Sequence, residues 1–217
     1  MGQNLAALCE KGTRGAETAA LVDRVGGDGV YTDIFSFDGD ADVIIDFSHP
    51  TCAPVLAKYA AENGTALVMA TTGHDDGELA AIYEAAKSVP VFMSANMSLG
   101  VALLAELAAK TAALFPDADI EIIEKHHNQK LDVPSGTALA LADAVKAVRE
   151  EAEFVVGRHE NGKRRKEEVG IHSLRLGGVV GEHEVIITTG NETISLKHEA
   201  HSRAVFADGG VMAAAYV

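Results

Sequence analysis

The pattern of apolar segments changes near Ser98, and this change limits the chain to a fold with two parts. Before Ser98, strand-like runs alternate with helix-like runs, which predicts a parallel sheet with right-handed connections. The continuous apolar run 42–48 predicts a strand buried on both faces of that sheet. The predicted elements are a first helix ending at Gly12, strands over 18–24, 42–48, 65–71 and 89–96, and helices over 53–63 and 75–87.

After Ser98, strands and helices no longer alternate. A long apolar helix ends at Pro116, a strand follows, and Ser135 is placed to cap another helix. Three strand-like runs then follow in succession, which favours a mixed or antiparallel sheet. The strands predicted here are 119–127, 169–175, 183–189 and 192–199, and the charged segment 158–168 is expected to be a solvated loop.

The fold class predicted from these patterns is α/β, with a Rossmann-like parallel sheet domain and an α+β domain with a mixed, mostly antiparallel sheet. The last residues are small and apolar, and we expect them to form a helix that returns to the first domain. The expected domains are therefore 1–97 with 204–217, and 98–203.

Composition excludes several classes of function. The chain has 18 Lys and Arg against 32 Asp and Glu, a formal net charge of −14. It therefore lacks the charge to neutralise nucleic-acid phosphates, and an anionic membrane surface would repel it. With two cysteines, no membrane-length apolar run and no signal-like start, we expect a reduced, cytoplasmic protein.

The segment Glu124–Thr137 has the highest density of reactive side chains. Alternation along a strand places Glu124 and His126 on one face and His127 on the other. Lys130 follows in a turn, and the helix that starts near Ser135 has free N–H groups that attract an anion. This combination predicts a site that reduces or protonates a small anionic molecule.

Other interpretations of this segment stay open. The histidines and Lys130 are equally consistent with packed or solvent-facing residues that have no chemical role. A metal site on Glu124, His126 and His127 is a further alternative, although neighbouring side chains on a strand diverge. Arg203 is suited to holding a carboxylate through its two-pronged guanidinium. We expect three other histidines to be packed or surface residues: His172, His183 and His198.

The first half contains a weaker signal for a dinucleotide. Ala70–Gly73 follows a strand and precedes a helix, where ligands bind in parallel-sheet folds. Asp23 ends another strand and is suited to a ribose, while Arg24 is suited to a 2′-phosphate. No G-x-G-x-x-G phosphate loop is present.

Several strings together resemble the 4-hydroxy-tetrahydrodipicolinate (dihydrodipicolinate) reductase family. The most specific is HHNQKLDVPSGT, His126–Thr137, and the matches run in order over nearly the whole chain. The other strings are VIIDFSHP from Val43, ATTG from Ala70, ANMSLG from Ala95, IEIIEKHH from Ile120, HSLR from His172, VGEH from Val180 and SRAVFA from Ser202.

The resemblance implies NAD(P)H-dependent reduction of a small dicarboxylate in the diaminopimelate route to lysine, by a homotetramer with a dinucleotide-binding N-terminal domain and a substrate-binding and oligomerisation domain. It implies that His126 donates a proton with Lys130 as second catalytic group, after hydride reaches C4 of a conjugated imine. The substrate ligands implied are His127, Gly136, Thr137 and Arg203. The cofactor contacts implied are Met1, Asp23, Arg24, Ala70, Thr71, Thr72, Ser94, Ala95, Asn96 and Met97. Asp23 and Arg24 favour opposite cofactors, so both NADH and NADPH stay open.

The chain departs from the family pattern at three places. Met1-Gly2 resembles the end of the family's glycine-rich turn, whose preceding strand we expect to be missing, and the chain stops before the usual C-terminal segment. Ala70 stands where a glycine is common. These departures leave an alternative, a non-catalytic subunit that binds a dicarboxylate or supports assembly.

Overall fold

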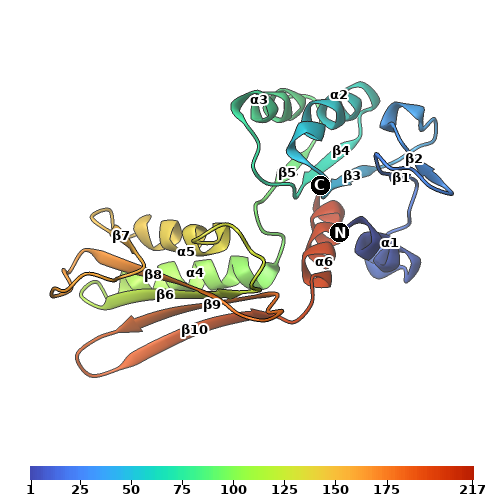
Figure 1. Cartoon of the computed structure of the whole chain (residues 1–217). Coiled ribbons are helices and arrows are strands. Elements are labelled where there is room, and N and C mark those ends of the chain that lie inside the picture. The colour runs from blue at the N-terminus through green and yellow to red at the C-terminus, as the bar shows by residue number, and fades with distance from the viewer. The chain divides into compact units, whose positions relative to one another are not determined.

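The structure, a computed structural model, describes all 217 residues and divides into two compact units. The first unit comprises Met1–Met97 and Arg203–Val217, and the second comprises Ser98–Ser202. Figure 1 shows a sheet with helices in each of them. None of the helices is both long and apolar enough to cross a membrane.

A three-stranded parallel sheet forms the centre of the first unit, in the order β3-β4-β5. Helices α2 and α3 cover one face of this sheet, and α6 packs on the other face against α1 (Figure 1). The bounds are β3 Val43–Asp46, β4 Ala66–Met69, β5 Val91–Met93, α1 Gly2–Glu10, α2 Ala53–Asn63, α3 Asp76–Ala85 and α6 Ala204–Tyr216. The predicted Rossmann-like parallel sheet and the returning C-terminal helix are confirmed.

The strand buried on both faces is β4, not the one predicted. Every residue of β4 is buried, with Leu67 and Met69 in the α2–α3 core and Val68 in the core on the other face. In β3 only Asp46 is buried, so the prediction of full burial for 42–48 is wrong. The reason is position, because β3 is at an edge of this sheet and β4 is central.

Local signals in the sequence fix the helix ends of this unit. Gly64 ends α2 in the left-handed conformation, with φ 68°, and Asp75 forms a capping box with Glu78 at the start of α3.

Within α6, a Cβ on Gly209 would lie 1.7 Å from the Met97 carbonyl oxygen. Only glycine therefore allows α6 to approach this closely.

The remaining elements of the first unit are short. The predicted strand 18–24 is reduced to β1, which pairs in parallel with a strand that the sequence did not predict, β2. Short 3₁₀ turns connect the rest. The bounds are β1 Leu21–Val22, β2 Val30–Tyr31, η1 Thr13–Gly15, η2 Ile34–Ser36 and η3 Pro50–Cys52.

The second unit contains a five-stranded mixed sheet in the order β10-β9-β6-β8-β7. Pairs β10–β9 and β9–β6 are antiparallel, and pairs β6–β8 and β8–β7 are parallel. The bounds are β6 Asp119–His126, β7 Glu153–Val156, β8 Glu168–Arg175, β9 Gly181–Thr188 and β10 Thr193–Ala200. The predicted mixed sheet is confirmed, and β7 is a strand that was not predicted from the sequence.

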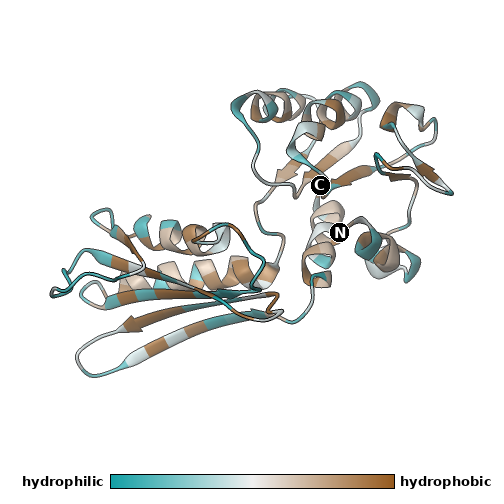
Figure 2. Ribbon diagram, viewed as in Figure 1, coloured by the Kyte–Doolittle hydropathy of each residue, from teal (hydrophilic) through white to brown (hydrophobic).

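Helices α4 (Leu99–Leu114) and α5 (Gly136–Lys146) cover one face of this sheet. Ser98 and Ser135 cap them, as predicted for Ser135. Residues along β10 alternate between the two faces of the sheet, and Figure 2 shows this alternation as bands of opposite hydropathy. The core beneath the helices includes Ile120, Ile122, Leu141, Val145, Ile171 and Val185.

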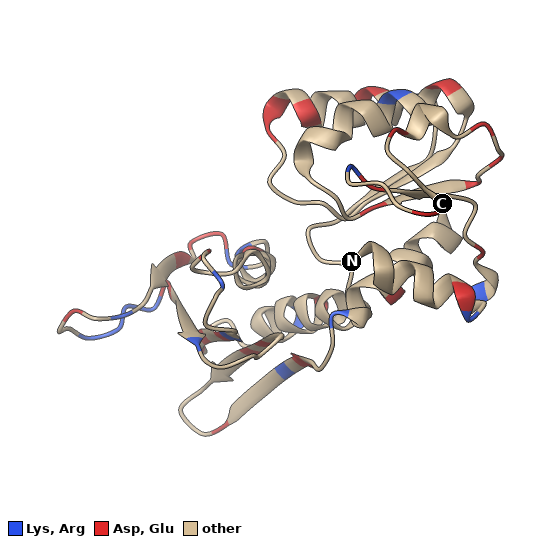
Figure 3. Cartoon of the chain, turned by 45° about the vertical axis from the view of Figure 1, so that its right-hand side comes forward, with Lys and Arg blue, Asp and Glu red and all other residues tan.

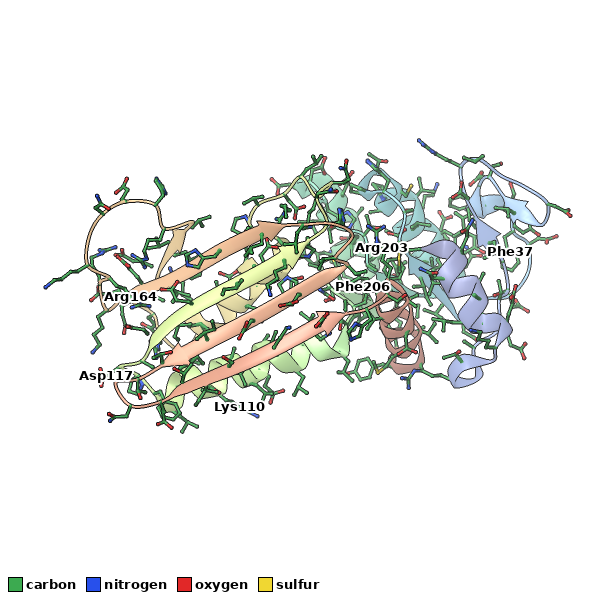
Figure 4. All side chains as sticks on the ribbon, turned by 60° about the horizontal axis from the view of Figure 1, so that its bottom comes forward. Phe37, Lys110, Asp117, Arg164, Arg203 and Phe206 are labelled. Carbon is green, nitrogen blue, oxygen red and sulfur yellow. The ribbon has the colours of Figure 1, made fainter.

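The opposite face of the sheet has no helix over it and is rich in charge (Figure 4). The basic residues of the loop between β7 and β8 are conspicuous in Figure 3, and several are paired: Arg164 lies 2.8 Å from Asp119, and Arg158 lies 2.7 Å from Glu168. Glu168 is itself buried and begins β8. The predicted solvated loop is confirmed over 158–167, where most residues are exposed. It is wrong only at Glu168, which is buried and belongs to β8.

Candidate active site

The site is built where β6 ends beneath the helices. Burial alternates along β6, so Glu124 and His126 share the helix-covered face with Ile120 and Ile122, as predicted. Glu124 is fully buried and His126 is 8% exposed. His127 lies just beyond the strand and is partly exposed.

Glu124 is an ionised carboxylate with many hydrogen-bond donors. Arg175 donates to both of its oxygens, each at 2.8 Å, and the Ser135 backbone N–H donates to Oε1 at 3.1 Å. Its Oε2 lies 2.6 Å from Nδ1 of His126. Burial by itself would raise the pKa of Glu124, but the hydrogen bonds from Arg175, His126 and the Ser135 amide lower it to about 2.

His126 lies among groups with opposing effects on its protonation. Burial lowers its pKa, the Glu124 carboxylate raises it, and the positive charges of Lys130 and Arg175 lower it again, so that the net shift is downward. His126 is therefore a neutral imidazole at neutral pH when no anion is bound. The neighbouring Lys125 pairs instead with Glu182.

A second buried histidine supports the start of α5. The Ser135 hydroxyl caps α5 by accepting from the Ala138 N–H at 3.2 Å, and it lies 3.1 Å from Nε2 of His183. The His126 and His183 rings meet edge to face with centroids 5.1 Å apart. Burial lowers the pKa of His183 to about 4, so it is neutral at pH 7.

Arg175 also anchors the loop that carries Lys130. Its guanidinium donates to the Asp132 carbonyl at 2.7 Å, and Nζ of Lys130 lies 2.8 Å from the Asp132 carboxylate. The Lys130 side chain is 21% exposed, so it is accessible to a ligand. Gly136 and Thr137 are the first two residues of α5, at its positive end.

The predicted cofactor residues lie mainly at the carboxyl edge of the first unit's sheet. The Ala70 N–H donates to the Asp46 carbonyl, and the Ser94 N–H donates to the Met69 carbonyl, which joins the ends of all three strands. Thr72 and Ala95 are exposed there, and Met97 is buried. The Ser94 hydroxyl donates to the Asn96 carbonyl at 2.8 Å, which closes the turn after β5.

Two buried polar atoms at this edge have no partner in the chain: Oδ2 of Asp46 and Oγ1 of Thr71. Buried polar atoms are rarely left unpaired, so this edge suits a polar ligand. It is also where parallel-sheet folds bind dinucleotides. The residues present therefore fit part of an NAD(P) molecule.

The remaining predicted residues lie elsewhere. Met1 precedes α1 as its N-cap, Arg24 is exposed, and Asp23 accepts the Val25 N–H in a turn after β1. Arg203 belongs to the first unit, where it is exposed and precedes α6 (Figure 4).

The metal-site alternative receives no support from the side chains. No three His, Cys, Asp or Glu residues of the chain are arranged to hold an ion, and Glu124 is instead bonded to Arg175. His172 and His198 are packed residues, as expected: His172 contacts Glu121 at 2.8 Å and His198 contacts Ser98 at 3.3 Å.

The pairing of Arg175 with Glu124 was not predicted from the sequence. In the parallel ladder between β6 and β8, Glu124 lies opposite Ser173 and His126 lies opposite Arg175. Arg175 thus reaches back diagonally to the carboxylate. Only the strand register could have revealed this contact.

Comparisons with known proteins agree on one family. The family model described as dihydrodipicolinate reductase, N-terminus, matches residues 1–97, and the C-terminus model matches residues 100–217. The 4-hydroxy-tetrahydrodipicolinate reductase of Caldanaerobacter subterraneus is 47% identical over 190 residues, covering 87% of this chain and 76% of the relative. That of Clostridium tetani is 47% identical over 193 residues, covering 87% and 74%.

A solved structure has the same fold over nearly the whole chain. It is described as dipicolinate-bound dihydrodipicolinate reductase from Paenisporosarcina sp. TG-14, with a TM-score of 0.78, 24% identity, and coverage of 99% of this chain and 89% of that one. The relatives carry the names of enzymes and give no support to the binding-subunit alternative. The chain belongs to the 4-hydroxy-tetrahydrodipicolinate reductase family.

Proposed function

We propose that this chain reduces 4-hydroxy-tetrahydrodipicolinate to tetrahydrodipicolinate with NAD(P)H, in the diaminopimelate route to lysine. The observation that carries the proposal is the buried His126–Glu124–Arg175 group beside the N-terminus of α5, in a member of the reductase family. In balance, substrate, NAD(P)H and one proton give product, NAD(P)⁺ and water.

The substrate is a small dicarboxylate, and the site contains groups suited to its charge. The N-terminus of α5 offers the N–H groups of Gly136 and Thr137, with Lys130 nearby and His127 beyond the strand. We assign Arg203 to the second carboxylate. The dipicolinate-bound relative supports this class of ligand.

His126 supplies the proton to the carbon next to C4, and Lys130 assists. Nδ1 of His126 faces Glu124, which leaves Nε2 to give up the proton. Two substrate carboxylates beside the ring offset the charges of Lys130 and Arg175, so binding raises the pKa of His126 and charges the acid. When bound, NAD(P)H provides the hydride.

The first unit is the proposed dinucleotide-binding domain. We assign cofactor contacts to Ala70, Thr71 and Thr72, to 94–97, and to Met1, with Asp23 and Arg24 near the adenosine ribose. Asp23 favours a free 2′-hydroxyl and Arg24 favours a 2′-phosphate, so the choice between NADH and NADPH is a matter for measurement.

We further propose that the chain acts as a cytoplasmic homotetramer. The charged face of the second unit's sheet has no helix over it, and β7 and β10 are edge strands. Self-association is an ordinary way to cover such surfaces.

The test is to generate the substrate in situ and follow NADH and NADPH oxidation with this chain and with His126→Ala. We expect the chain to oxidise NADH or NADPH in the presence of substrate, and His126→Ala to do so about 10²–10⁴-fold more slowly. If neither cofactor is oxidised, the proposed reaction is refuted. Equal oxidation by the variant would refute the role of His126.

A further inference from the structure

Glu124 has no free capacity for a ligand. It is 0% exposed, and a buried charge is stable only if partners compensate it. Arg175 supplies two hydrogen bonds, the Ser135 amide one and His126 one. Its carboxylate therefore acts on its neighbours and does not bind substrate itself.

The contact with Glu124 determines which nitrogen of His126 carries a proton. An ionised carboxylate only accepts hydrogen bonds, so Nδ1 at 2.6 Å must be the N–H donor. In the neutral ring, Nε2 is then the unprotonated atom. Nε2 lies beside Gly181 on β9, where an added Cβ would be only 3.2 Å from this nitrogen. Because glycine has no side chain, the space next to Nε2 stays open.

Arg175 and Glu124 also connect the three parts of the proposed site. Glu124 contacts both His126 and the first turn of α5, and Arg175 contacts both Glu124 and the carbonyl of Asp132 in the Lys130 loop. A shift of the carboxylate would therefore change the proton donor and the anion-binding turn together.

We propose that Glu124, held by Arg175, is a positioning residue that fixes the orientation and tautomer of His126, so that Nε2 is the atom that transfers the proton. The kinetic consequence rests on the proposed reductase function, whereas the tautomer does not. The charged and titratable groups around His126 are Glu124 on β6, Arg175 on β8, His183 on β9, and Lys130 and Asp132 on the following loop.

The first test uses the unaltered protein. The chain is labelled with ¹⁵N-histidine, its ring signals are recorded by NMR without ligand at neutral pH, and the His126 signal is assigned by its loss in His126→Gln. We expect the Nδ1–H tautomer. An Nε2–H tautomer, or a mixture of the two, would overturn the proposal without any measurement of activity.

The second test uses Glu124→Gln, with Glu124→Asp as the conservative variant. The amide can donate to Nδ1, which favours the Nε2–H tautomer, and kcat should fall about 10²–10³-fold with little change in KM. The alkaline limb of kcat/KM should move to lower pH. Glu124→Asp keeps the charge, so it should retain the Nδ1–H tautomer and recover part of kcat.

The matched control is Glu121→Gln. Glu121 lies on the same strand and contacts a histidine, His172, at 2.8 Å, but on the opposite face of the sheet. This control should keep kcat within about twofold and leave the His126 signal unchanged. A loss of kcat in Glu124→Gln without a change of tautomer would overturn the proposal. If the unaltered chain oxidises neither cofactor, the proposed reaction fails while the NMR result still decides this inference.

Discussion

Strand β6 carries a glutamate–histidine contact on each of its faces, and the two differ in their surroundings. Glu124 and His126 lie under the helices at 2.6 Å, with Glu124 fully buried. Glu121 and His172 lie on the uncovered face at 2.8 Å, with about a third of each side chain exposed. The two contacts have the same residue types and similar distances, but the buried one should be the stronger, because burial controls how strongly charges interact.

The largest expected difference is in activity. His126→Ala should lower kcat/KM by about 10²–10⁴-fold, because the proton donor is removed. His172→Ala should stay within about twofold of the unaltered chain. Steady-state NAD(P)H oxidation measures both, and similar losses in the two variants would contradict the distinction between the faces.

The next difference is in stability. Arg175→Ala leaves the buried Glu124 charge without its partner and should lower the free energy of unfolding by about 3–5 kcal/mol. Lys197→Ala, on the uncovered face, should cost much less, because Lys197 is about half exposed and its partner Glu182 keeps Lys125. Urea unfolding at pH 7 compares them, and an equal cost would show that burial does not govern the pairs.

Lowering the pH should destabilise the second unit, because two buried groups on the helix-covered face of its sheet, His183 and Glu124, have lowered pKa values. Burial lowers the pKa of His183 to about 4, so between pH 6.5 and 4 the unfolded chain binds a proton that the folded chain does not. The free energy of unfolding should fall by up to about 3 kcal/mol as pH drops through this range. Below about pH 4.5 Glu124 should add a further loss, since its folded pKa is about 2.

Urea unfolding at pH 7, 5.5 and 4 measures this effect. His183→Gln should flatten the dependence between pH 6.5 and 4. His201→Gln removes a histidine whose side chain is 84% exposed, and it is the surface control with which the slope of His183→Gln is compared. An unchanged slope in His183→Gln would contradict the assignment.

The smallest expected effects come from two glycines, one beside each pair. Gly181→Ala places a methyl group 3.2 Å from Nε2 of His126. It should lower kcat several-fold, which corresponds to a rise of about 1 kcal/mol in the activation free energy. In Gly170→Ala the methyl group would overlap the Glu121 carboxylate, so stability should fall while kcat is kept. Kinetics and urea unfolding together separate the two, and an exchange of these effects would contradict the comparison.

The sequence predicted those features that depend on local patterns. Alternation along β6 placed Glu124 and His126 on one face, and Ser135 was recognised as a helix cap from its position before an apolar helix. The contact of Arg175 with Glu124 could not be predicted, because it joins residues 51 positions apart through the register of two strands.

The errors have the same origin. The run 42–48 is as apolar as a central strand, yet its burial depends on which strands lie beside it. β7 is only four residues long and has no alternation that distinguishes it from a loop. Glu168 was placed in the preceding loop, but it is the first residue of β8, and its burial depends on the strands and loop residues around it.

The glycine contact between α6 and Met97 has a consequence for synthesis of the protein. The helix that completes the first unit is encoded after the whole of the second unit. Chains are made from the N-terminus, so residues 98–202 can reach their final packing on the ribosome while the first unit still lacks one of its layers. The side of β3 and β4 that α6 covers is thus uncovered in a growing chain until α6 has been made.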